Sequence, residues 1–164
     1  MWRSVVAGLC VTSVAWADGA RPPRDVHHVD WANRGYTSVY AGADPVIVVD
    51  GEGTLDGLRF TVGTPVFADL DGDGHDDAII VVWRETAQGH SASAIEIFTV
   101  RRGAVVRLAE ITGGQGLRGG IDHVELDHRS LVVVRYAGPE RQRERWRWKA
   151  GKLTEDVRAR RRLD

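Results

Sequence analysis

The sequence predicts an all-β fold: a single-domain antiparallel meander of about nine short strands, arranged as a sandwich or an open barrel. Its apolar residues fall in short β-branched runs or alternate with polar residues, and no stretch keeps a helical period. Glycine-rich turns separate these runs at intervals of about 8 to 15 residues. Of the 164 residues, 43% are hydrophobic and 27% are charged, so one core of ordinary size can form.

The first 17 residues predict a secretory signal peptide. Arg3 precedes the apolar run 5–14, which has about half the length needed to span a bilayer, and Ala15-Trp16-Ala17 has the small-x-small pattern of a cleavage site. No later run is long and apolar enough to be a transmembrane segment. The only Cys, Cys10, lies in the removed part. We therefore expect an exported protein, periplasmic or extracellular, without a disulfide or a Cys-ligated metal.

Nine strands are expected after the signal peptide. They cover, in order, residues 45–50, 58–62, 64–69, 78–83, 94–100, 104–109, 121–126, 130–136 and 145–149. The fifth and sixth should form a hairpin, because Arg102-Gly103 supplies a two-residue turn between them. No change in composition marks a second domain. The expected organisation is a β-rich domain over 18–157 and a basic tail over 158–164, with frayed ends at 18–24 and 158–164.

Charge is unevenly distributed along the chain. The whole sequence has 22 basic and 23 acidic residues, but residues 18–100 hold 5 basic and 14 acidic ones, and residues 101–164 hold 16 and 9. The first part can gather cations and the second can meet an anionic surface. Nucleic acid would suit the basic part, but an export signal argues against that partner. The pattern does not indicate an oligomeric state.

An acidic loop between two expected strands is the densest functional signal. It places four Asp at positions 1, 3, 5 and 9 with Gly74 at position 6, the spacing that folds oxygen ligands around Ca²⁺. Gly74 permits the sharp bend at the centre of the loop. The expected ligands are the side chains of Asp69, Asp71, Asp73 and Asp77 and the backbone carbonyl of His75. The sequence therefore predicts Ca²⁺ as a cofactor, bound in loop 69–77.

The charge of this loop is a second reason to expect a cation. Loop 69–77 contains five Asp, and no Lys or Arg lies between Phe60 and Val82 to neutralise them along the chain. The alternative is a solvated Asp-Gly turn without an ion, since such turns are common. The loop is not an EF-hand or a dockerin module, because position 12 is Ile80 and strands, not helices, flank it.

Residues 64–83 resemble the calcium loop of the FG-GAP or VCBS repeats of integrin-like β-propellers, in which Asp-x-Asp-x-Asp-Gly-x-x-Asp joins two strands. This chain has one copy, and a propeller of at least four blades of roughly 40 residues each does not fit its length. With Val29-Asp30-Trp31, Tyr36 and Arg145-Trp146-Arg147-Trp148, the loop also makes the chain look like small exported bacterial proteins that carry a single such motif. That resemblance implies a location in the cell envelope.

The segment 141–149 is the second candidate surface. As a strand it places its basic residues on one face and Trp146 and Trp148 on the other. One interpretation puts the Trp pair in the core and the basic row in water; the other is an edge strand whose basic row docks on an anionic envelope polymer or lipid head group. The expected binding residues are Arg143, Arg145, Trp146, Arg147 and Trp148.

No catalytic motif is present. The 6 His are scattered, without His-Glu-x-x-His, and no Gly-x-Ser-x-Gly elbow or phosphate-binding loop occurs. His123, Glu125 and Asp127 share one face of an expected strand, which is most simply a solvated face. We therefore expect an exported, non-catalytic calcium-binding β-domain with a surface for a protein or an envelope glycan. The alternative is a Ca²⁺-dependent hydrolase of envelope polysaccharide or peptidoglycan, in which Asp76 is the first candidate acid or base.

Overall fold

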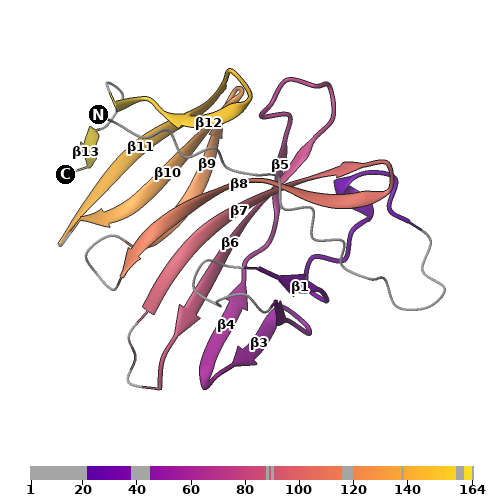
Figure 1. The fold of residues 1–164 in the computed structure, drawn as a ribbon. Helices are drawn as coiled ribbons and strands as arrows, with labels where there is room; N and C mark the ends of the chain where they lie inside the picture. Colours follow the sequence, from indigo (N-terminus) through magenta and orange to yellow (C-terminus); the bar gives the residue numbers. More distant parts are fainter. Residues whose placement is uncertain are drawn as a thin grey trace, which may run out of the picture.

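A computed structural model describes residues 22–37, 45–87, 89, 91–115, 120–137, 139–157 and 161–163, which form an all-β fold with one short 3₁₀ helix (Figure 1). The expected signal peptide, residues 1–17, lies outside the described residues. Within the described part, no helix is long and apolar enough to cross a membrane. The all-β prediction is confirmed.

The elements follow one another along the chain in simple order. They are η1 (Val26–His28), β1 (Gly35–Tyr36), β2 (Val46–Ile47), β3 (Glu52–Leu55), β4 (Leu58–Val62), β5 (Val66–Ala68), β6 (Asp77–Glu85), β7 (Ser91–Arg101), β8 (Ala104–Gln115), β9 (Ile121–Asp127), β10 (Ser130–Ala137), β11 (Glu140–Lys149), β12 (Lys152–Glu155) and β13 (Arg161–Leu163).

Three antiparallel sheets contain these strands. The larger sheet has the order β3-β4-β6-β7-β8, with β5 also paired to β6, and the second sheet has the order β12-β11-β10-β9, with β13 also paired to β11. Strands β1 and β2 form a separate pair. Most neighbours in a sheet are also neighbours in sequence, so the expected meander is confirmed, and the two main sheets form an open sandwich without a closed barrel.

The expected hairpin at Arg102-Gly103 is present. Strands β7 and β8 pair from Arg101 and Ala104 outward, and the two turn residues have φ of 53° and 75°, as a type I′ turn requires. This turn matches the twist of the strands that it joins.

The structure has four strands more than the nine expected: β1, β3, β12 and β13. Strand β3 escaped prediction because Gly51 and Gly53 indicated a turn. Gly53 is instead inside the strand, where a Cβ atom would lie 2.5 Å from the Ile47 carbonyl oxygen. The glycine therefore marks a close approach of two backbones.

The prediction of a frayed C-terminal tail is wrong over Arg161–Leu163. This segment forms β13 and pairs with residues 141–143 of β11. Strand β12 covers only residues 146–149 of the same edge, so β13 satisfies backbone groups that β12 leaves open.

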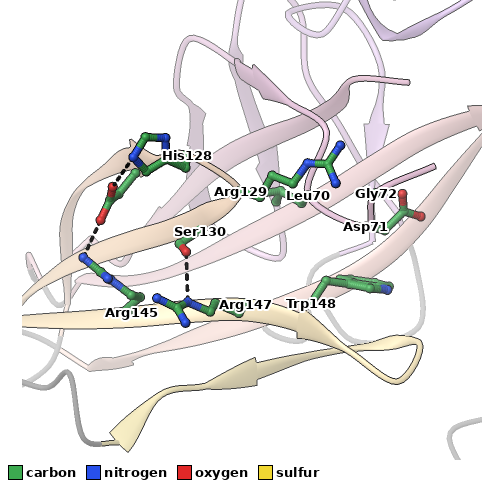
Figure 2. Close-up of a pocket in the computed structure, with 10 residues that line it drawn as sticks. Leu70, Asp71, Gly72, His128, Arg129, Ser130, Arg145, Arg147 and Trp148 are labelled. Atoms are coloured by element: carbon green, nitrogen blue, oxygen red, sulfur yellow. Dashed lines mark hydrogen bonds and ion pairs between the residues drawn. The ribbon is translucent and has the colours of Figure 1, made fainter. Parts of the chain in front are cut away.

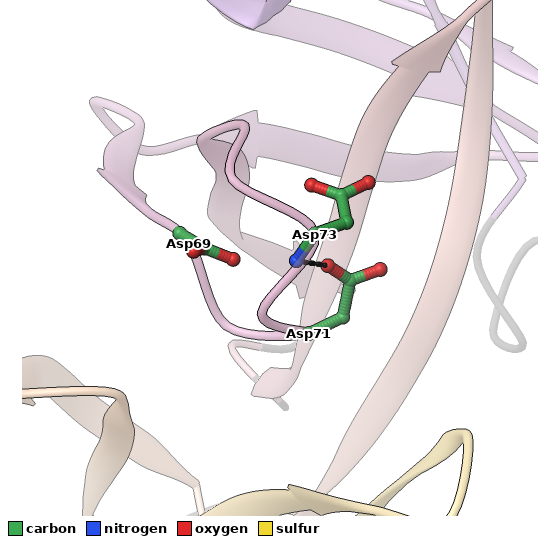
Figure 3. Close-up of side chains that lie close together, drawn as sticks. All are labelled: Asp69, Asp71 and Asp73. Carbon is green, nitrogen blue, oxygen red and sulfur yellow. Dashed lines mark hydrogen bonds between the residues drawn. The ribbon is translucent and has the colours of Figure 1, made fainter.

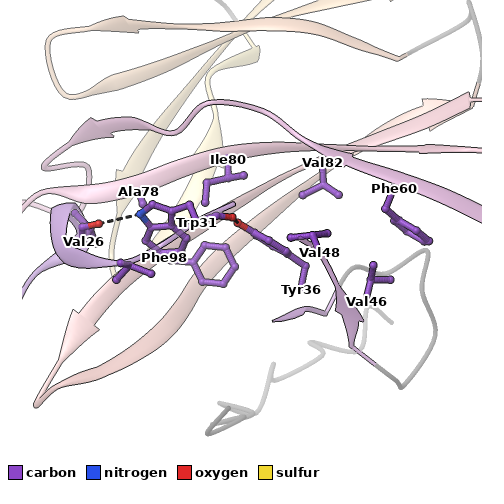
Figure 4. Close-up of a cluster of buried hydrophobic side chains, with 11 residues drawn as sticks. Val26, Trp31, Tyr36, Val46, Val48, Phe60, Ala78, Ile80, Val82 and Phe98 are labelled. Carbon is purple, nitrogen blue, oxygen red and sulfur yellow. Dashed lines mark hydrogen bonds between the residues drawn. The ribbon is translucent and has the colours of Figure 1, made fainter. Parts of the chain in front are cut away.

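Both faces of the larger sheet are buried, and Figure 4 shows the cluster on one of them; this explains the almost uninterrupted apolar run of β6. On one face Ile80 and Val82 lie in a cluster closed by the N-terminal segment, through Val26, Trp31 and Tyr36. On the other face, a second cluster joins the larger sheet to the second sheet, through Ile79, Val81, Ile95, Leu131 and Val133. The larger sheet therefore lies between the second sheet and the N-terminal segment.

Candidate metal centre and adjoining groove

The acidic loop closes a short hairpin between β5 and β6. Val66 pairs with Ile79 and Ala68 pairs with Asp77, so the residues between them must turn within a small space. Asp69, Asp71 and Asp73 each offer a carboxylate oxygen, and these three oxygens lie within 4.8 Å of one another (Figure 3). The structure thus brings together three of the five expected ligands.

Backbone amides hold these three carboxylates in place. Asp69 Oδ1 accepts from Gly72 N at 2.7 Å, Asp71 Oδ1 from Asp73 N at 3.1 Å, and Asp73 Oδ1 from His75 N at 2.9 Å. The bonds of Asp71 and Asp73 each form an Asx turn, in which a side chain replaces a backbone acceptor, and the bond of Asp69 reaches one residue further. The loop therefore has a defined shape in which the carboxylates converge.

Asp77 lies at the root of the loop, at the first position of β6, and its side chain is fully buried. Its Oδ2 accepts from Leu70 N at 3.1 Å, and its Oδ1 is buried without a hydrogen bond of normal geometry. Burial raises the pKa of Asp77 to about 6, and the charge of Asp71 adds to this shift. The group of converging carboxylates does not include Asp77. His75 is exposed.

Two distant arginines pair with the loop. Arg101 Nη2, at the end of β7, lies 3.2 Å from Asp71 Oδ2, and Arg129 Nη2, in the turn between β9 and β10, lies 3.0 Å from Asp69 Oδ2. No Lys or Arg lies near the loop in sequence, as expected. The folded chain nevertheless brings Arg101 and Arg129 to its carboxylates. A bound metal ion would compete with both guanidinium groups for these carboxylates.

The candidate catalytic carboxylate of the hydrolase alternative is engaged elsewhere. Asp76 Oδ2 lies 3.0 Å from His27 Nε2 of the 3₁₀ helix η1, and both side chains are about half exposed. The imidazole also packs on Phe67 of β5, with ring centroids 4.3 Å apart. This contact ties the N-terminal segment to the acidic loop.

An open groove lies beside the loop (Figure 2). Its volume is about 460 Å³. One side is formed by loop residues 70–72 and the other by the ends of β9, β10 and β11 and the turn between β9 and β10. The residues on this second side are Asp127, His128, Arg129, Ser130, Arg145, Arg147 and Trp148. The groove brings together the two segments that the sequence singled out.

Strand β11 is not an edge strand, which corrects one of the two interpretations of segment 141–149. It pairs with β10 on one side and with β12 and β13 on the other. Trp146 packs against the second core cluster, whereas Trp148 lines the groove. The two tryptophans therefore have different surroundings, although they share one face of the strand.

The basic row of β11 is largely paired with the acidic row of β9. Arg143 forms an ion pair with Glu125, and Arg145 forms one with Asp127, in both cases across β10. Val132 and Val134 of β10 lie between these rows and are only 2% and 1% exposed. The arginine stems thus cover an apolar strip on the outer face of the second sheet.

Arg147 differs from Arg143 and Arg145 in its partner. Its Nε donates to Ser130 Oγ at 3.1 Å, and it forms no ion pair with any described residue. It is therefore a guanidinium that is held in place without being neutralised.

Glu96 of β7 is a buried carboxyl group that the sequence analysis missed. It is 0% exposed, neither of its oxygens accepts a hydrogen bond within the described chain, and Arg107 Nη1 lies 3.7 Å from Oε2. Burial raises the pKa of Glu96 to about 8. The sequence places Glu96 inside the expected strand 94–100, but no pattern there shows that both faces of this strand are covered.

No protein-family model matches this sequence, and neither a curated protein nor a solved structure matches it. The resemblance to FG-GAP and VCBS loops therefore rests on residues 64–83 themselves.

Proposed function

We propose that this chain is an exported, non-catalytic calcium-binding β-domain of the bacterial cell envelope. It holds one structural Ca²⁺ in loop 69–77 and presents the adjoining groove to a protein or an envelope glycan. The observation that carries the proposal is the convergence of Asp69, Asp71 and Asp73 on a hairpin whose root contains the buried Asp77 carboxyl. One oxygen of this carboxyl accepts no hydrogen bond of normal geometry from the described residues.

The donor set favours a hard divalent cation. All the candidate donors are oxygens, and a calcium ion takes oxygen ligands at about 2.3–2.6 Å. Two oxygens on opposite sides of such an ion are about 5 Å apart, so three oxygens that all lie within 4.8 Å of one another can reach the same ion. Asp77 Oδ1 is a buried acceptor for which a cation would compensate the lost solvation.

A structural role follows from the position of the loop. Asp77 is the first residue of β6, which lies in the middle of the larger sheet. Asp69 forms an ion pair with Arg129, and Asp71 forms one with Arg101. An ion in the loop would hold the wall of the groove in one shape, so that the groove is ready for a partner.

Calorimetric unfolding with and without Ca²⁺ tests the proposal. A ligand that binds only the folded state raises the unfolding midpoint, so we expect a rise of several degrees between EDTA and millimolar Ca²⁺. Asp71→Asn should lose this rise. Asp56→Asn, in the exposed turn between β3 and β4, is the matched control and should keep it. An unchanged midpoint in the unmodified protein would identify the loop as a solvated turn and refute the proposal.

A further inference from the structure

The groove beside the acidic loop has the size and lining of a site for a small ligand. Its volume of about 460 Å³ falls within the roughly 300–1,000 Å³ typical of such sites. It is open to solvent on one side. A ligand could therefore be one part of a longer polymer that continues beyond the groove.

The charges of the groove favour an anion. Three guanidinium groups line it, against the carboxylates of Asp71 and Asp127. Arg145 is paired with Asp127 and Arg129 with Asp69, but Arg147 has only the neutral Ser130 hydroxyl as its partner among described residues. A carboxylate that met Arg147 would gain a charge-assisted, two-pronged contact without breaking an existing ion pair.

The same groove contains a flat apolar surface. Trp148 is partly exposed and lies near the C-terminal end of β11. It lines the groove together with Asp71 and Gly72 of the acidic loop (Figure 2). An indole that presents a face to solvent beside polar groups offers packing area for an amphipathic ring. Trp146, two residues earlier, packs against the second core cluster instead and does not line the groove.

We infer that the groove binds a saccharide that carries a carboxylate. Arg147 takes the carboxylate, the Trp148 ring packs against the apolar face of the sugar, and Ser130 and Asp127 are within the groove to hydrogen-bond the hydroxyls. Other ligands would use part of this surface: a simple anion would use Arg147 alone, and a neutral saccharide Trp148 alone. The inference rests on the proposed function and names the ligand class of its binding surface.

The metal loop and the groove share residues, which couples the two sites. Asp71 belongs to both, and Arg129 lines the groove while its guanidinium is held by Asp69 Oδ2 at 3.0 Å. A cation that takes Asp69 competes with Arg129 and frees that guanidinium for an anion in the groove. Calcium should therefore tighten saccharide binding, and the saccharide should tighten calcium binding by the same factor.

Titration calorimetry with three probes tests the inference: a trimer of galacturonic acid, the neutral trimer of galactose, and inorganic phosphate, each in EDTA and in Ca²⁺. We expect the acidic trimer to bind in both media, at least about tenfold more tightly than either other probe, and severalfold more tightly with Ca²⁺. Arg147→Ala and Trp148→Ala should each weaken this binding by about tenfold. Arg147→Lys, which keeps the charge, should lose less than Arg147→Ala.

Two controls separate this site from general effects of charge and of metal. Arg59→Ala removes an exposed guanidinium that pairs with Glu52 at the edge of the larger sheet, and it should bind the acidic trimer as the unmodified protein does. Asp71→Asn should abolish the calcium effect on saccharide affinity, which excludes calcium chelation by the sugar itself as the cause.

Several results would overturn the inference. They are equal binding of the neutral trimer or of phosphate, unchanged binding by Arg147→Ala, or no binding of the acidic trimer. The calcium titration without saccharide is a separate readout. If Ca²⁺ binds but the acidic trimer does not, the ligand class is wrong and the calcium-binding function stands. If Ca²⁺ does not bind, the proposed function fails, and the saccharide result in EDTA still decides the ligand class.

Discussion

At the scale of single residues, the buried carboxyl of Glu96 has a direct consequence for stability. It faces Ile80 of β6 and Glu110 of β8 in the sheet, and the charged groups packed near it are Arg34, Arg107 and Glu110, together with the Tyr36 hydroxyl. Burial favours the neutral acid, which is why the pKa of Glu96 is raised from 4.5 to about 8.

The stability of the fold should therefore depend on pH through Glu96. The Glu96 carboxyl loses its proton near pH 4.5 in the unfolded state and near pH 8 in the folded state. The contribution of Glu96 to stability therefore falls as the pH rises through the window between these values. Glu96→Gln stays neutral. Its free energy of unfolding, relative to that of the unmodified protein, should rise between pH 5 and pH 9 by more than about 1 kcal/mol.

Urea unfolding at pH 5, 7 and 9 measures this difference. Glu85→Gln, which removes an exposed carboxyl at the end of β6, is the control and should show no such trend. A constant difference between Glu96→Gln and the unmodified protein across this range would mean that Glu96 is charged in the fold.

Single residues also show what the sequence could and could not predict about the metal centre. The convergence of Asp69, Asp71 and Asp73 follows from spacing within one loop, which is local information. Arg101 and Arg129 reach the same carboxylates from sequence distances of 30 and 60 residues. No pattern in the sequence indicates these contacts. The first depends on the pairing of β6 with β7, and the second depends on how the second sheet packs against the larger sheet.

At the scale of elements, the outer face of the second sheet is a charged layer laid over an apolar strip. The stems of Arg143 and Arg145 cross β10, and Val132 and Val134 are buried beneath them. Ion pairs that remain partly exposed contribute little to stability, typically about 0–1 kcal/mol. The apolar stems that cover Val132 and Val134 should therefore contribute more to stability than the ion pairs of Arg143 and Arg145.

This view predicts different effects for two substitutions of Arg145. Arg145→Ala uncovers Val132 and should destabilise the fold by about 1–2 kcal/mol, whereas Arg145→Met keeps an apolar stem of similar length and should recover most of that loss. Chemical denaturation of both variants checks this. If Arg145→Met is as unstable as Arg145→Ala, the ion pair with Asp127 is the dominant contribution.

The strands show a second limit of sequence prediction. All nine expected strands have a counterpart, because β-branched runs and alternation are strong signals when a strand is buried. Strands β1, β3, β12 and β13 have two to four residues each and lack such runs. These strands pair where a neighbouring strand has unpaired backbone groups, as β13 does with residues 141–143 of β11. Their own sequence does not indicate this pairing.

At the scale of the whole molecule, the N-terminal segment covers one face of the larger sheet. Trp31 is 5% exposed, packs against Phe98 with ring centroids 5.3 Å apart, and donates from Nε1 to Val26 O at 2.8 Å. The sequence predicted every strand of this sheet except β3, but it did not predict this cover, because the segment has no hydrophobic period of its own.

Removing the Trp31 side chain should expose that face. We expect Trp31→Ala to lower the free energy of unfolding by about 3–5 kcal/mol, as for other large side chains deleted from a core. Val49→Ala, at a side chain that is 63% exposed, should change it by less than about 0.5 kcal/mol. Equal losses in the two variants, measured by urea denaturation, would show that the segment does not contribute to the core.

The predicted export of the protein can also be tested. The signal-peptide pattern predicts that the native host cleaves the chain after Ala17, so that the mature protein begins at Asp18. Cell fractionation with N-terminal sequencing checks this, and deletion of residues 2–17 should leave the protein in the cytoplasm. Uncleaved protein in the cytoplasm of the native host would contradict the predicted export.

The order of the strands has a consequence for how the chain folds. Strands β6, β7 and β8, and then β10 and β11, each pair with the strand that precedes them, so the largest contacts close over short stretches of chain. Closing a short loop costs less chain entropy than closing a long one, and local pairing is associated with fast folding. The β7–β8 hairpin, with its type I′ turn, is the natural place for folding to begin. A chain that crosses a membrane unfolded would benefit from such an order, because each hairpin can form as soon as its two strands have emerged.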